Sequence, residues 1–145
     1  MGTIFSQEQM LLLGIMIAVP CVGIVFTLYM RAMLNAFREK TRFIETRNQL
    51  TSFRHLVGAA MYGSLFQISL LFVPLLVFLY GLADGILGLP YVLVVVVPSG
   101  IYLLFYVRYK RLEQRVQAIG MDNQELLQEF IHIVSTWRKK SLPKW

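Results

Sequence analysis

Three long stretches of the chain are predominantly apolar and uncharged, with no Asp, Glu, Lys or Arg in any of them. They cover residues 10–30, 56–82 and about 86–107. About 20 apolar residues form a helix long enough to cross the hydrocarbon core of a bilayer. The pattern therefore predicts an all-α integral membrane protein with three transmembrane helices. Residues 1–145 are expected to form a single membrane domain.

The segment between the first two stretches also has a helical pattern. Residues 31–54 contain no Pro or Gly and keep apolar residues at roughly helical spacing as far as Ile44. We therefore expect the first helix to continue into this segment and the chain to fold back near Thr46–Gln49. Residues 31–54 would then form a basic helical extension outside the membrane.

Two helix starts show the spacing of a capping box, in which an N-cap residue and the residue three positions later bond to each other's backbone N–H. Ser6 and Gln9 have this spacing before the first apolar stretch. Asp122 and Glu125 have it at the start of a segment whose apolar residues recur every three or four positions. An amphipathic C-terminal helix is therefore predicted over residues 122–140.

The basic residues are confined to two blocks, although the net charge of the whole chain is only +6. All 14 Lys and Arg residues lie within residues 31–54 and 108–144. The remaining segments, residues 1–9 and the short turn around Asp84, carry only two charged residues, Glu8 and Asp84. Because Lys and Arg accumulate on the cytoplasmic side of membrane proteins, we expect the N-terminus outside and the C-terminus inside. The expected location is the bacterial inner (plasma) membrane.

Composition narrows the classes of function further. The chain is 57% apolar, which is too high for a water-soluble domain. No nucleic-acid recognition fold fits into the segments outside the apolar stretches, so a nucleic-acid partner is not expected. Cys21 is the only cysteine, which excludes a disulfide framework or a cysteine metal site within one chain. Basic residues next to a membrane attract anionic lipid headgroups, which we expect as partners.

Small residues spaced four apart predict two helix–helix interfaces. Helices in lipid associate mainly by close backbone packing, which small side chains allow. The predicted interface residues are Ala59 with Gly63, Ala60 with Ser64, then Gln67, and in the first stretch Gly14 with Ala18. We expect the Gln67 amide to hydrogen-bond across helices, with a pore-lining role as the alternative. The neighbouring helix could belong to this chain or to another protein.

Two further sets of residues are candidates for docking to a membrane surface or to a partner. Arg38 and Arg42 lie one helical turn apart and repel each other unless lipid phosphates or partner carboxylates face them. The C-terminal helix has an apolar stripe and a basic end, with the candidates Leu127, Phe130, Ile131, Val134, Trp137, Arg138, Lys139 and Lys140. This pattern is typical of a helix at the membrane interface. Docking against residues 31–54 or against a partner subunit explains it equally well.

The chain lacks the groups that catalysis would need. No Asp, Glu, Lys, Arg or His lies within the three apolar stretches, where a transporter or proton channel usually has one. His55 and His132 lie outside the stretches, so they are poorly placed to hold a haem between helices. No metalloprotease, hydrolase or phosphate-loop motif occurs. We therefore predict a non-enzymatic protein without a cofactor or metal.

A small chain without catalytic groups is expected to work by association. The first hypothesis is a non-catalytic polytopic subunit that assembles into, or scaffolds, a larger membrane protein complex, with other membrane subunits or copies of itself as partners. The alternative is a self-associating membrane pore or small channel, in which Ser64, Gln67 and Ser69 would supply a polar stripe. Three spans, an outside N-terminus and a basic inside C-terminus give a layout similar to that of class I phage holins, a resemblance of topology alone.

Overall fold

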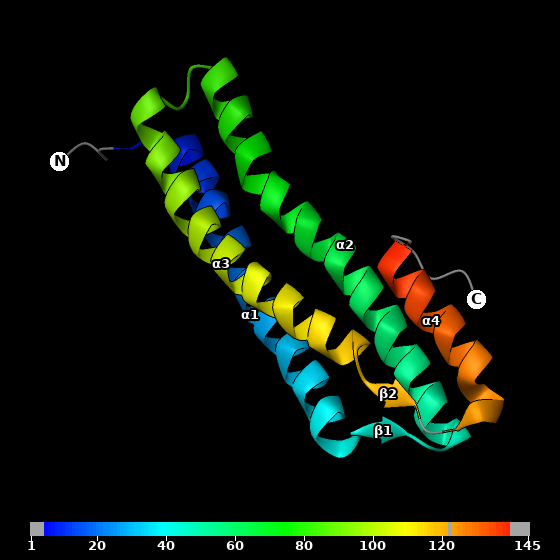
Figure 1. Ribbon diagram of the computed structural model, residues 1–145. Helices are drawn as coiled ribbons and strands as arrows, with labels where there is room; N and C mark the ends of the chain where they lie inside the picture. Colours follow the sequence, from blue (N-terminus) through cyan, green and yellow to red (C-terminus); the bar gives the residue numbers. More distant parts are fainter. Residues whose placement is uncertain (1–4, 122, 140–145) are drawn as a thin grey trace. The chain divides into compact units, whose positions relative to one another are not determined.

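The computed structural model of the chain describes residues 5–121 and 123–139, and it is almost entirely helical (87%). Its elements, shown in Figure 1, are α1 (Gln7–Lys40), β1 (Phe43–Ile44), α2 (Arg47–Ala83), the 3₁₀ helix η1 (Leu89–Tyr91), α3 (Val92–Gln117), β2 (Gly120–Met121), the 3₁₀ helix η2 (Gln124–Leu126) and α4 (Leu127–Lys139). The chain divides into two compact units, one of residues 1–27 and 67–107 and one of residues 28–66 and 108–145. The three long helices contribute residues to both units.

Three helices are long and apolar enough to span a membrane. α1 has 34 residues, α2 has 37, and the third helix, from η1 through α3, has 29. Each exceeds the roughly 20 residues that a span needs. The predicted helices over residues 10–30 and 56–82 are confirmed as helices. The third predicted stretch differs at its start, because residues 86–88 precede the helix, which begins at Leu89.

The turn between α2 and α3 explains this later start. Gly85 has a positive φ of 70°, which residues with a Cβ rarely adopt. The carbonyl of Gly81 accepts hydrogen bonds of 2.9 Å from the backbone N–H groups of Ile86 and Leu87, and these bonds terminate α2. Pro90 lies in the first turn of η1, where its missing N–H leaves no bond unmade.

The first unit contains an apolar core built from the three long helices and this turn. The core residues are Leu12, Met16, Phe78, Leu87 and Val95. The predicted capping box is confirmed, because the Ser6 N–H donates to Gln9 Oε1 at 3.0 Å and the Gln9 N–H donates to Ser6 Oγ at 3.1 Å. The Gln9 amide also donates to the Ile86 carbonyl at 2.7 Å. The cap of α1 therefore also holds the turn that precedes η1.

The second unit contains a separate core and a short parallel pairing of strands. Its fully buried residues include Leu34, Ile44, Leu50, Phe53, Val57, Tyr109, Val116 and Ile133. β1 pairs with β2, with Phe43 opposite Gly120 and Ile44 opposite Met121. The prediction that residues 31–54 are helical up to a return near Thr46–Gln49 is wrong in part. α1 ends at Lys40, and the chain turns over residues 41–46.

Thr46 ends the turn and caps α2, and Gln49 lies in the first turn of that helix. The Gln49 Oε1 atom accepts hydrogen bonds from the N–H groups of Glu45 at 2.9 Å and Thr46 at 3.2 Å, and the Gln49 N–H donates to Thr46 Oγ1 at 3.3 Å. This is a capping box. Ile44 has no exposed surface, so the extended strand contributes a core side chain at a position where apolar spacing predicted a helix.

The C-terminal helix also begins later than predicted. The side-chain oxygen of Asn123 accepts a 3.0 Å hydrogen bond from the Glu125 N–H and caps η2. Asp122, the expected N-cap, lies outside the described residues, as does Lys140. A 3₁₀ turn therefore takes the place of the first predicted α-helical turns, and α4 itself covers Leu127–Lys139.

Candidate functional site

Arginines from two helices of the second unit line one groove of about 370 Å³. The lining residues are Arg31, Asn35 and Arg38 of α1 and Arg108, Arg111, Leu112 and Arg115 of α3. Residues three, four or seven positions apart lie on one face of a helix, so each helix presents one arginine face. We call this feature the arginine groove.

A second hollow, of about 690 Å³, shares Asn35, Arg38 and Arg115 with the arginine groove. It is also lined by Arg42, just after the end of α1, and by Phe43 and Gly120, which form one pair of the β1–β2 strands. The strand pairing joins the segment after α1 to the segment after α3. It therefore places the predicted docking residues Arg38 and Arg42 in one hollow.

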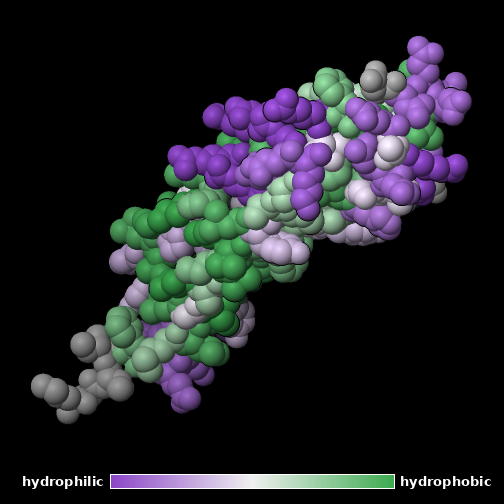
Figure 2. Space-filling model, turned by 90° about the horizontal axis from the view of Figure 1, so that it is seen from below, coloured by the Kyte–Doolittle hydropathy of each residue, from purple (hydrophilic) through white to green (hydrophobic). Residues whose placement is uncertain are grey.

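The six arginines of these two hollows have no neutralising partner within the described part of the chain. No hydrogen bond or ion pair joins the side chain of any of them to another described residue. Among the described lining residues, Glu39 is a carboxylate of the second hollow, and the arginine groove has none. Figure 2 shows hydrophilic side chains gathered together on the face that it draws. These positive charges lie close together without a neutralising partner, so they create a positive potential. This potential attracts anions.

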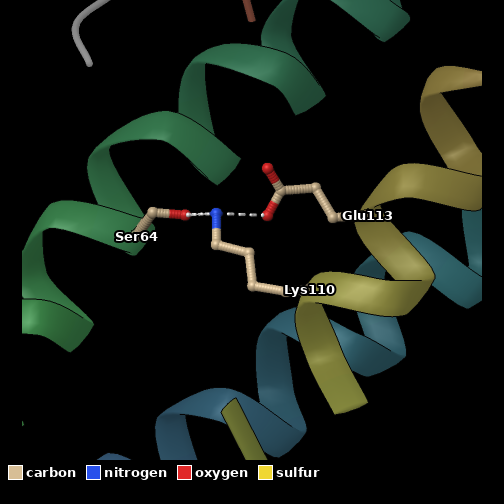
Figure 3. A network of polar contacts seen from close by, with 3 residues as sticks. All are labelled: Ser64, Lys110 and Glu113. Atoms are coloured by element: carbon tan, nitrogen blue, oxygen red, sulfur yellow. Dashed lines mark hydrogen bonds and ion pairs between the residues drawn. The ribbon is translucent and has the colours of Figure 1, made fainter. Parts of the chain in front are cut away.

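A polar network in the same unit joins α2 to α3 (Figure 3). The Lys110 ammonium donates a 2.9 Å hydrogen bond to Ser64 Oγ and forms a 2.9 Å ion pair with Glu113 Oε2. Glu113 is only 5% exposed, and a buried carboxylate is stable only when it is paired. The charge of Glu113 is therefore balanced by Lys110 on its own helix.

The predicted small-residue positions of α2 are divided between the inside and the outside of the chain. Ala60, Gly63 and Gln67 are buried, Ser64 is half-buried and Ala59 is exposed. The buried positions take part in packing within this chain. Ala59 remains open to a neighbour from outside.

The small face of α1 is entirely open. Gly14 and Ala18 are both exposed. Apart from the adjacent residues and backbone of α1 itself, no atom lies within 4 Å of the position that a Cβ on Gly14 would occupy. Gly14 therefore packs against no other element of the described chain, and Ala18 keeps an exposed side chain.

The side-chain amide of Gln67 is buried, with 1% of the residue exposed. Neither its nitrogen nor its oxygen has a hydrogen-bond partner among the described residues. The backbone carbonyl of Gln67 instead accepts a 2.8 Å hydrogen bond from the Tyr102 hydroxyl of α3. The expected bond from the amide across helices is thus replaced by a bond to the backbone.

One side of α4 packs against Phe53 of α2. The ring centroid of Phe53 lies 5.5 Å from that of Phe130 and 6.0 Å from that of Trp137. Trp137 is buried, while Phe130 and Val134 are half-buried. This arrangement corresponds to docking on the returning arm of residues 31–54, one of the possibilities that the sequence left open.

The other side of α4 remains available to a membrane surface or a partner. Leu127 and Ile131 are 40% and 55% exposed. Arg138 and Lys139, in the last turn, are also exposed. Lys140, predicted to belong to the same surface, lies outside the described residues.

The described residues contain no group of three or more His, Cys, Asp or Glu side chains that could hold a metal ion. Comparison of the chain with known protein families, curated proteins and solved structures finds no match.

Sequence reasoning missed most of the arginine groove. Arg108, Arg111 and Arg115 have a one-face spacing that was visible in the sequence, but Arg31 joins them only because α1 and α3 lie together in this unit. In the sequence, Glu113 stood out only as an acidic residue within a basic segment, and its ion pair was not predicted. Its distance of three residues from Lys110 was the signal that could have identified the ion pair.

Proposed function

We propose that this chain is a non-catalytic subunit of a larger membrane assembly, in which it contacts other membrane proteins or further copies of itself. The proposal rests on the small face of α1, where Gly14 and Ala18 are exposed with open space beside Gly14. In lipid, small residues four apart let a second helix backbone approach closely. A neighbouring helix from another protein would fill this space.

The proposed orientation follows from the charges. With the N-terminus outside and the basic segments in the cytoplasm of a bacterial cell, all Lys and Arg residues lie on the side that such residues favour. The arginine groove would then lie at the cytoplasmic headgroups, because Arg31 and Arg108 directly follow two apolar stretches. The outer side of α4 would face the same surface.

A self-associating pore of holin-like topology has less support. Its polar stripe would have to face a water-filled lumen between copies. Gln67 is buried within the chain, and Ser64 accepts a hydrogen bond from Lys110. Ser69 is the exposed member of the three residues.

The first test is extraction of the chain from its native membrane in a mild detergent, followed by light scattering on a sizing column and mass spectrometry. We expect a large assembly that contains other membrane proteins or several copies. A monomer that carries no other protein would contradict the proposal. A homo-oligomeric ring that conducts ions in planar bilayers would favour the pore.

A matched pair of variants tests the interface itself. Gly14→Leu fills the space on the small face of α1 and is expected to reduce the assembly to smaller particles. Gly100→Leu makes the same change at another exposed glycine with no atom within 4 Å of a Cβ position, and the assembly should persist. Equal particle sizes for the two variants would remove α1 as the interface.

A further inference from the structure

The arginine groove has a positive charge that no described residue balances. Five arginines line about 370 Å³, and none of them pairs with a carboxylate among the described residues. Like charges held close together destabilise the folded chain. An anion in the groove would turn this repulsion into attraction, so the groove favours an anionic ligand.

The choice of arginine over lysine narrows the chemistry of that ligand. All five cations of the groove are arginines, although α1 also contains Lys40 and α3 contains Lys110. A general attraction to an anionic surface needs only charge, which lysine supplies equally well. The planar guanidinium donates two parallel N–H bonds, and this geometry matches the oxygens of a phosphate group.

The dimensions of the groove indicate more than one phosphate. From Arg31 to Arg38 the α1 face extends about 10 Å, at about 1.5 Å per residue. A volume of about 370 Å³ falls within the range of small-molecule sites. A single phosphate would leave most of the five charges unbalanced, whereas two phosphates could engage arginines of both helices. Asn35 lies between Arg31 and Arg38 on α1, and its side-chain amide adds a neutral hydrogen-bond donor to the groove.

We propose that the arginine groove is a binding site for a ligand that carries two phosphate groups. The shared chemistry has two possible sources, the headgroup of a doubly phosphorylated lipid and a soluble diphosphate compound. The seven lining residues all belong to this chain. The site can therefore be tested on the isolated chain, and its failure would leave the assembly proposal untouched.

The experiment is a calorimetric titration of the full chain, purified in a neutral detergent. The probes are inorganic phosphate, inorganic diphosphate, a short-chain lipid with two phosphate groups, a short-chain zwitterionic lipid and an oligoglutamate peptide. We expect at least one two-phosphate probe to bind about tenfold more tightly than inorganic phosphate, because further charge-assisted hydrogen bonds form. Binding of diphosphate that is tighter than binding of the two-phosphate lipid would identify a soluble ligand, and binding of that lipid alone would identify a headgroup.

Matched variants separate the groove from the general basic charge of the chain. The double variant Arg38→Gln/Arg115→Gln removes one cation from each helix of the groove and should weaken two-phosphate binding about tenfold or more. Arg47→Gln/Arg138→Gln removes the same charge from residues that do not line the groove and should weaken it by less than about threefold. Arg38→Lys/Arg115→Lys keeps the positive charge but loses the paired N–H groups of the guanidinium. This variant should also bind the two-phosphate probes more weakly.

Three results would overturn the proposal. Two-phosphate probes that bind no better than inorganic phosphate or the zwitterionic lipid would remove the site. Equal losses of affinity in the groove variant and in its charge-matched control would show general electrostatic attraction and not a binding site. Oligoglutamate that binds as tightly as diphosphate would assign the groove to an acidic protein segment instead. The side chains of Arg38 and Arg115 have no partner among the described residues, so the glutamine variant should unfold at the temperature of the unmodified chain or above it, because repulsion within the groove is reduced.

Discussion

The ring of Tyr102 in α3 lies directly against the backbone of Gly23 in α1. A Cβ on Gly23 would come within 2.7 Å of the ring. The Tyr102 hydroxyl donates a 2.8 Å hydrogen bond to the backbone carbonyl of Gln67 in α2. One buried tyrosine therefore contacts both other long helices in the first unit. The absence of a side chain at Gly23 is what allows α1 and α3 to approach this closely.

Replacement of Gly23 by alanine should destabilise the chain by about 1–3 kcal/mol, the usual cost of overpacking a core. The Tyr102 ring could move away only by losing the hydrogen bond of its hydroxyl to Gln67. The measurement is the unfolding midpoint of the purified chain in detergent. Gly100→Ala is the control, since no atom lies within 4 Å of its Cβ position, and alanine favours the helix. Equal midpoints for the two variants would contradict the close approach.

Tyr102→Phe tests the hydrogen bond separately from the packing. The ring remains while the hydroxyl is lost, so the free energy of unfolding should fall by about 1 kcal/mol. Tyr62→Phe makes the same chemical change at an exposed residue of α2 and should leave the midpoint nearly unchanged. A midpoint for Tyr102→Phe that matches the unmodified chain would mean that the hydroxyl contributes nothing.

The long helices could be predicted from the sequence because their signal is local. An uncharged apolar stretch of more than 20 residues has few alternatives to a membrane helix, and Ser6 with Gln9 marked the start of α1 correctly. The strands could not be predicted, because a pair of two-residue strands has no periodicity. Ile44 continued the apolar spacing of α1 even though it belongs to β1.

The candidate site depended on contacts between residues far apart in the chain. Of the residues that line the groove, only Arg38 was predicted as a docking residue. Its spacing from Arg42 made their mutual repulsion visible within one segment. Arg31 and Arg115 line the same groove although 84 positions separate them in the numbering, and no local pattern reports that distance. The burial of Gly63 within the chain likewise depends on which face of α2 turns inward.

The ion pair of Lys110 with Glu113 makes a prediction about compensation. Lys110→Met removes the cation and leaves a buried carboxylate without its ion pair, which should lower the free energy of unfolding by about 1–3 kcal/mol. Adding Glu113→Leu removes the carboxylate as well and should restore part of the loss, since a buried pair replaced by apolar residues is often neutral. Chemical unfolding of both variants measures the difference. A double variant less stable than Lys110→Met would contradict this account of Glu113.

The contacts of Phe53 predict how α4 is held. Phe53 has no exposed surface and lies in ring contact with Phe130 and Trp137. Phe53→Ala should cost about 3–5 kcal/mol and release α4, so that a glutamate-specific protease cleaves after Glu129 about tenfold faster or more, since such cleavage follows local opening. Ile131→Ala, at a residue that is 55% exposed, should leave the cleavage rate nearly unchanged. Equal rates in the two variants would mean that Phe53 does not hold the helix, and a lipid surface would then be the better explanation of its apolar residues.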